Sequence, residues 1–154
     1  MKSPDTPPFT LWQHNSLIGY DPLPDKLSDL LELALDDLEK IEKNPRYGIT
    51  MSAWHEPLPD GICHVCLAGA VMAQTLEVPH NSDITPSLFP DTLSRKLNAL
   101  DFLRKGEIAY AQMQMGMDVY TQGLDIDVIK YHIDPKGFKQ TLRKLVPELR
   151  EKGL

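Results

Sequence analysis

The 154-residue chain is 42% hydrophobic and 25% charged, so one domain of this size can bury a core without disulfides or metal ions. Its formal net charge of -6 at pH 7 argues against a nucleic-acid-binding protein that relies on a basic surface, and against a polybasic membrane anchor. No stretch approaches the ~20 consecutive apolar residues that cross a bilayer, so we expect no contact with a membrane.

Residues 1–24 contain five prolines and no helical periodicity. Because Phe9, Trp12 and Tyr20 are too apolar for a free tail, we predict an extended N-terminal arm that packs on the body of the protein. Residues 1–15 contain no apolar run of the kind that forms the core of a signal peptide. We therefore expect a cytoplasmic protein, in which the cysteines stay reduced.

The first helix is predicted over residues 25–44, where apolar residues recur at steps of three and four. Asp25 is placed to cap its start, and Pro45 ends it. Acidic residues outnumber lysines in this helix, which gives it a charge of about -4. Asp36 and Asp37 fall on the face opposite the leucines, so we predict that both are solvated.

The connector that follows contains an alternation of Tyr47, Ile49 and Met51, which predicts a short strand or a β-hairpin near residues 47–51. A second helix is predicted over residues 63–76, where small residues allow another helix to pack closely. A third helix is predicted over residues 91–106, where a glycine interrupts the pattern.

The last helix begins at Pro135 after an N-cap at Asp134, and Pro147 is expected to kink it. Its charge of about +4 complements the first helix, within one chain or across a dimer. Helix and strand patterns compete over residues 107–133. Three methionines there are expected to fill the core, at positions 113, 115 and 117.

These patterns together predict a mainly α fold. We expect a single compact domain, residues 1–154, with four to five helices, an extended N-terminal arm over residues 1–24, and room for one short β-hairpin.

The only two cysteines, Cys63 and Cys66, form a CxxC motif. A structural zinc site needs four ligands, and the chain has no second CxxC and no HxxxH pair. Zinc bound by Cys63, Cys66, His55 and His80 is therefore an alternative, and the expectation is no metal and no cofactor. A helix N-terminus lowers the pKa of a thiol, which makes Cys63 the candidate reactive thiol. We nevertheless predict that both sulfurs fill the core, because the strand that precedes a thioredoxin-type dithiol is not apparent.

Trp54 and His55 lie in the connector just ahead of the cysteines. A tryptophan in such a place normally buries its ring and fixes the loop. The alternative is a small-ligand pocket formed by Trp54, His55, Cys63 and Cys66. The histidines also lie near enough in sequence to serve a cysteine nucleophile, but no complete catalytic set is apparent. An enzyme is therefore not the expectation.

The segment from Ile49 to Ala73 resembles a stretch of small, uncharacterised phage, prophage and bacterial proteins. In that family a Met-x-x-Trp motif is followed by a pair of cysteines that leads into an Ala-Gly-rich helix. The matching positions here are Met51, Trp54, Gly61, Cys63, Cys66, Ala68 and Gly69. The resemblance implies a compact accessory protein, and it implies no reaction and no catalytic residues.

The leading functional hypothesis is therefore a non-enzymatic interaction protein of the phage or prophage accessory type. Its partner is expected to be another protein or a second copy of the chain. A thiol- or zinc-dependent protein centred on Cys63 and Cys66 is the first alternative, and a small-ligand-binding module near Trp54 and His55 is the second.

Overall fold

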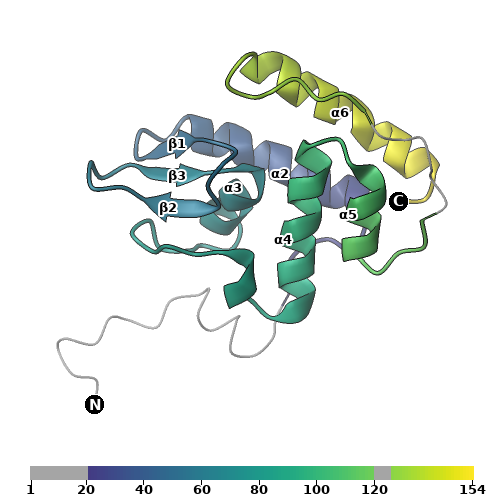
Figure 1. The fold of residues 1–154 in the computed structure, drawn as a ribbon, viewed down its shortest axis with the longest axis horizontal. Coiled ribbons are helices and arrows are strands. Elements are labelled where there is room, and N and C mark those ends of the chain that lie inside the picture. Colours follow the sequence, from purple (N-terminus) through teal and green to yellow (C-terminus); the bar gives the residue numbers. More distant parts are fainter. Residues whose placement is uncertain (1–20, 120–125) are drawn as a thin grey trace.

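The structure is a computed structural model that describes residues 21–119 and 126–154. The predicted N-terminal arm lies outside these residues, apart from its last four positions. The described part consists of five α-helices, a three-stranded sheet and one short 3-10 helix (Figure 1). The mainly α fold class is thus confirmed. The elements are α2 (Leu27–Glu42), β1 (Tyr47–Ile49), β2 (His55–Pro57), β3 (Cys63–Val65), α3 (Leu67–Gln74), η1 (Pro86–Leu88), α4 (Asp91–Arg104), α5 (Ile108–Gln114) and α6 (Pro135–Glu151).

Helix α2 is the centre of the fold and contacts α3, α4 and α6. Its leucines are buried as the three- and four-residue spacing predicted. The prediction that Asp25 caps this helix was wrong, because the N-cap is Lys26 and no side chain caps the first turn. The Asp25 carboxylate instead accepts a hydrogen bond from the ammonium of Lys96, which is buried at the side of α4 and also donates to the carbonyl of Leu23.

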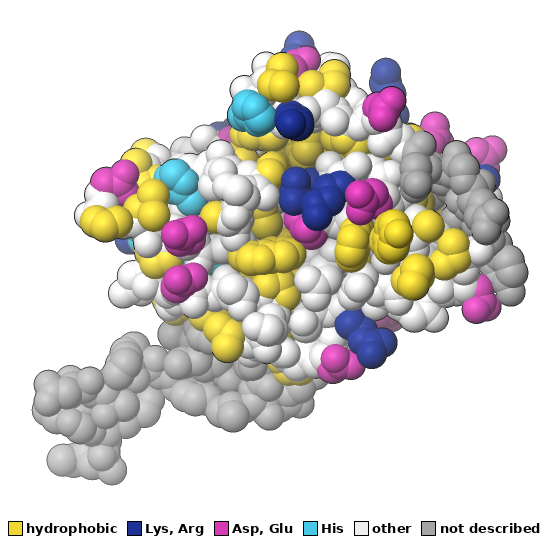
Figure 2. Space-filling model, viewed as in Figure 1, with side chains coloured by type: hydrophobic (Ala, Val, Ile, Leu, Met, Phe, Trp, Pro, Cys, Tyr) yellow, Lys and Arg dark blue, Asp and Glu magenta, His cyan; other side chains and the backbone are white. Residues whose placement is uncertain are grey.

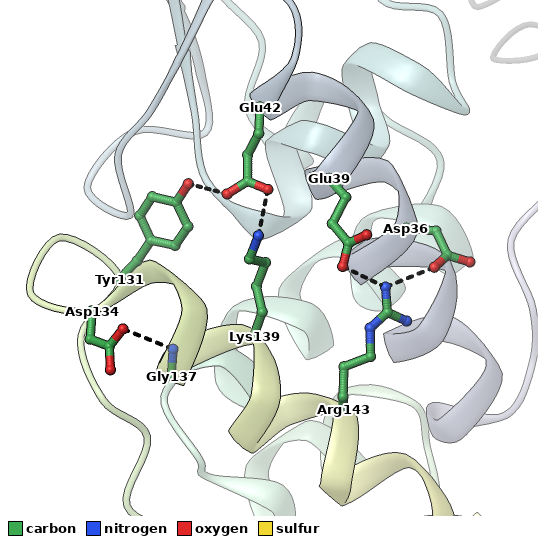
Figure 3. Close-up of polar contacts among 8 residues, drawn as sticks. All are labelled: Asp36, Glu39, Glu42, Tyr131, Asp134, Gly137, Lys139 and Arg143. Carbon is green, nitrogen blue, oxygen red and sulfur yellow. Dashed lines mark hydrogen bonds and ion pairs between the residues drawn. The ribbon is translucent and has the colours of Figure 1, made fainter.

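The complementary charges of the first and last helices meet within one chain. Helix α6 lies along α2, and its basic side chains reach acidic side chains of α2 (Figures 1 and 3). Arg143 bridges Asp36 and Glu39, each at 2.9 Å. About two turns further along, Arg150 bridges two more acidic residues of α2, Asp29 and Glu32. The N-terminal cap of α6 is the predicted one, because the Asp134 carboxylate accepts a hydrogen bond from the Gly137 amide.

The prediction that Asp36 and Asp37 are both solvated was wrong for Asp37. Its side chain is buried, and one carboxylate oxygen accepts a hydrogen bond from the Thr75 hydroxyl at 2.5 Å. The helical spacing places Asp37 beside the leucine stripe, and α3 packs over that edge of α2. Burial raises the pKa of Asp37 to about 6, although the Thr75 hydrogen bond and the nearby Lys40 oppose the rise.

The predicted start of the second helix, at residue 63, was wrong. Residues 63–65 form strand β3, in which the buried Cys63 and Val65 alternate with the less buried His64. Helix α3 begins only at Leu67. Strand β3 is the middle strand, antiparallel to β2 and parallel to β1. The hairpin of the fold is therefore β2–β3, not one at residues 47–51, although β1 does occupy the predicted short strand.

The ambiguous segment contains one short helix, α5, and no regular element in its other described residues, 115–119 and 126–133. Met113 is 59% exposed, so the prediction that it fills the core was wrong, whereas Met115 and Met117 pack partly buried against the core. Among the described residues, no helix combines the length and apolar character needed to cross a membrane.

Candidate functional site

The Cys63 thiol and the His55 imidazole meet inside the small sheet. Both side chains are buried, and Cys63 Sγ lies 3.5 Å from His55 Nδ1 and 3.8 Å from Nε2. His55 Nδ1 also lies 2.6 Å from the Ser82 carbonyl oxygen. Because a carbonyl only accepts, Nδ1 carries the proton and donates it to that oxygen.

Burial keeps this pair uncharged. It lowers the pKa of His55, and it raises the pKa of Cys63 to about 11. A thiol with such a pKa supplies almost no thiolate at neutral pH, and thiolate is the form that attacks substrates and binds metals. His55 and Cys63 are thus packed against each other in surroundings whose burial favours their uncharged forms.

Cys66, rather than Cys63, occupies the N-terminus of α3, which corrects the placement of the candidate reactive thiol. Its sulfur accepts a hydrogen bond from the Gly69 amide at 3.4 Å and so caps the helix. Burial nevertheless raises the pKa of Cys66 to about 11, more than the Gly69 and Ala68 amides lower it. The desolvation of a buried sulfur outweighs the helix terminus here.

His80 contacts the backbone of Arg46 and the ring of Tyr47. Its Nε2 lies 2.7 Å from the carbonyl oxygen of Arg46, and the Tyr47 ring makes edge contacts with both His80 and His55. Within residues 21–119 and 126–154, no three His, Cys, Asp or Glu side chains are grouped so that they could hold a metal ion.

Trp54 is partly buried against the core and lines a small cavity of about 230 Å³. Cys66 lines the same cavity, together with Met51, Asp101 and Arg104. His55 and Cys63 are not among its lining residues. Of the four residues predicted for a ligand pocket, Trp54 and Cys66 thus share one small cavity, whereas His55 and Cys63 contact each other and do not line it.

A larger groove of about 710 Å³ lies beside this cavity and was not anticipated from the sequence. We call it the basic groove. It lies between the end of β1, the C-terminus of α4 and the loop that leads to α6. Six of its lining residues are apolar or aromatic: Ile49, Met51, Val128, Ile129, Tyr131 and Phe138.

Among the residues that the structure describes, the charged residues that line the basic groove are all basic. They are Arg104, Lys105 and Lys130, with His132 beside them, and the described lining contains no aspartate or glutamate. Asp101, which lines the smaller cavity, pairs with Arg104 at 2.7 Å and Lys105 at 3.3 Å, so it offsets part of this charge. Figure 2 shows basic side chains on both sides of a hydrophobic band between the end of α4 and the loop before α6.

The α4–α5 turn fixes one wall of the basic groove. The amides of Gly106 and Glu107 donate to Leu103 and Phe102 carbonyls, which is the Schellman arrangement at a helix C-terminus. Gly106 has φ +78°, and a Cβ there would lie 2.0 Å from the Ile126 carbonyl oxygen. Only glycine therefore allows the chain at residue 126 to lie against this turn.

The opposite wall is held by Glu42 at the end of α2. Its two carboxylate oxygens accept hydrogen bonds from the Tyr131 hydroxyl at 2.5 Å and the Lys139 ammonium at 2.7 Å (Figure 3). Burial and this contact raise the pKa of Tyr131, so its hydroxyl stays protonated and keeps donating. The Tyr131 ring also packs edge-on against Phe138. Hydrogen bonds and side-chain packing thus hold both walls of the groove in place.

The fold and the groove together define a mainly α domain with a small mixed sheet and a basic, apolar-floored groove at its surface. No protein-family model, curated protein or solved structure matches the chain.

The Cys66 cap leads to a stability prediction. Cys66→Ala is expected to lower the free energy of unfolding by about 1–2 kcal/mol, because the Gly69 amide loses its acceptor and a small void forms. Cys66→Ser should cost less, since serine is a preferred N-cap residue and keeps the acceptor. Urea unfolding of both variants measures the difference. Equal losses in the two variants would show that the sulfur contributes packing alone.

Proposed function

We propose that the chain is a non-enzymatic interaction protein that binds a segment of a partner protein in the basic groove. The observation that carries this proposal is the lining of the groove. Its described lining includes six apolar or aromatic side chains, and its described charged residues are all basic, in a chain whose net charge is -6. A local excess of positive charge in an acidic protein favours a partner segment that carries negative charge.

The state of the thiols supports the non-enzymatic part of the proposal. Cys63 and Cys66 are both buried, and burial raises the pKa of each to about 11. The thiol-dependent alternative requires an accessible thiolate, which neither residue supplies at neutral pH. The phage or prophage origin stays a prediction, since no comparison bears on it.

The test is a selection of short random peptides on the full chain, followed by affinity measurements on charge-reversed variants. Lys105→Glu combined with Lys130→Glu reverses two charges in the groove. We expect this variant to bind the selected peptides at least about tenfold more weakly, because the attraction becomes a repulsion.

The matched control carries the same change in charge elsewhere. Lys136→Glu combined with Lys144→Glu alters two exposed residues of α6 that do not line the groove, and it should bind the peptides as the unchanged protein does. Equal weakening in both variants would contradict the groove as the binding site. A selection that yields no peptide, with saturable binding of small anions instead, would replace the partner protein by a small molecule.

A further inference from the structure

Strand β1 is an edge strand, and its outer side is open among the described residues. The strand order is β1–β3–β2, so β1 has a paired strand on one side only. The Thr50 amide donates to Val65 and the Cys63 amide donates to the Arg46 carbonyl, so positions 46 and 50 face β3. Backbone groups of successive strand residues alternate between the two sides, so Ile49 points its N–H and C=O outward.

The outward backbone groups of Ile49 belong to a residue that lines the basic groove. Tyr47, the other outward residue of β1, already donates its amide to Asn44. Among the described residues, Ile49 is therefore the position where the sheet offers a backbone donor and acceptor without a partner strand beside the groove. An open edge of this kind is a template for one more strand.

The side chains that line the groove determine which side chains an added strand should have. An added strand points its side chains alternately to opposite sides, with a period of two residues. The described lining holds apolar side chains, Met51, Val128 and Phe138 among them, and the basic side chains of Lys105 and Lys130. A segment that alternates apolar and acidic residues offers partners to both kinds of side chain.

We propose that the partner segment binds in an extended conformation, as an added strand on the outer edge of β1, and that it alternates acidic and apolar residues. This inference rests on the proposed function, because it names the occupant of the same groove. It adds the conformation, the backbone contact at Ile49 and the side-chain pattern.

The probe is an acetylated and amidated peptide of four Glu-Val repeats, titrated into the full-length chain. We expect saturable binding, with amide chemical-shift changes at Ile49 and around the groove, and with slower hydrogen exchange of the Ile49 amide. The peptide with lysine in place of glutamate should bind at least about tenfold more weakly, because it meets basic side chains.

Backbone methylation separates strand addition from other modes of binding. Methylating alternate peptide amides removes the donors on one side of the added strand only, so either the valine set or the glutamate set faces β1. We expect one methylated peptide to lose binding and the other to keep it. This experiment leaves the protein unchanged, so misfolding of a variant cannot explain the result.

The outcomes distinguish this inference from the proposed function. If the Glu-Val peptide binds in the groove and neither methylated peptide is weakened, strand addition is wrong while the groove still binds partner segments. If no Glu-Val peptide binds, the inference is wrong, and the selected peptides still decide the proposed function. If these selected peptides bind outside the groove, both the proposed function and the strand addition are contradicted.

Discussion

Replacing Gly69 by alanine is expected to lower the free energy of unfolding by about 3 kcal/mol or more. A Cβ at this position would lie 1.7 Å from the Trp54 carbonyl oxygen and 2.9 Å from Val65 Cβ. Alanine favours a helix over glycine by about 1 kcal/mol, but a clash with backbone atoms in a packed core costs more. The connector that carries Trp54 has to move away from α3, and urea unfolding measures the loss.

Gly48→Ala is the matched control for that substitution. A Cβ at Gly48 would meet only side-chain atoms, the nearest at 3.3 Å on His64, and these can shift. We expect this variant to change the free energy of unfolding by less than about 1 kcal/mol. If Gly69→Ala proved as stable as Gly48→Ala, the close contact between Trp54 and α3 would be contradicted.

Replacing Asp37 by asparagine is expected to stabilise the protein more at neutral pH than in acid. The raised pKa of about 6 means that the native state binds a proton at Asp37 more tightly than the unfolded state does. The free energy of unfolding therefore falls as pH rises from about 4 to about 6, and above that range the native state carries the full cost of a buried charge. Asparagine carries no such charge and still accepts the Thr75 hydrogen bond.

The measurement is a pair of urea titrations of each protein, at about pH 4.5 and about pH 7.5. The stabilisation by Asp37→Asn should be about 2 kcal/mol larger at the higher pH. Glu148→Gln, an exposed change on α6, serves as the control and should give the same small effect at both pH values. An effect of Asp37→Asn that does not depend on pH would contradict a buried carboxyl group with a raised pKa.

Local patterns in the sequence predicted the helices well because their causes are local. The leucine spacing of α2 and the Asp134–Pro135 start of α6 act within a few residues, and both features appear in the structure. The opposite charges of these two helices indicated that they would meet, within one chain or across a dimer, and the structure shows them paired within one chain. One error fell at Cys63, where pairing with β1 and β2 makes a strand of residues that the sequence pattern predicted to be helical.

The candidate site had no comparable signal in the sequence. The Cys63–His55 contact follows from the pairing of β2 with β3, and the pairing of Asp37 with Thr75 follows from the packing of α3 on α2. The basic groove combines residues 49–52, 104–105, 128–132 and 138, which are distant along the chain. No motif joins these segments, because each contributes side chains that are ordinary in its own neighbourhood.

The sequence by itself determined that this protein is mainly helical and which faces of α2 and α6 are apolar. It also determined that these two helices carry opposite charges. Helix propensity, capping and amphipathic spacing depend on near neighbours, so the sequence carries them directly. Only the tertiary structure decided which polar residues are buried, that burial raises the pKa of both thiols, and that the basic groove lies beside an edge strand. Burial, pKa and concave surface depend on elements far apart in sequence, so they arise only when the chain has folded.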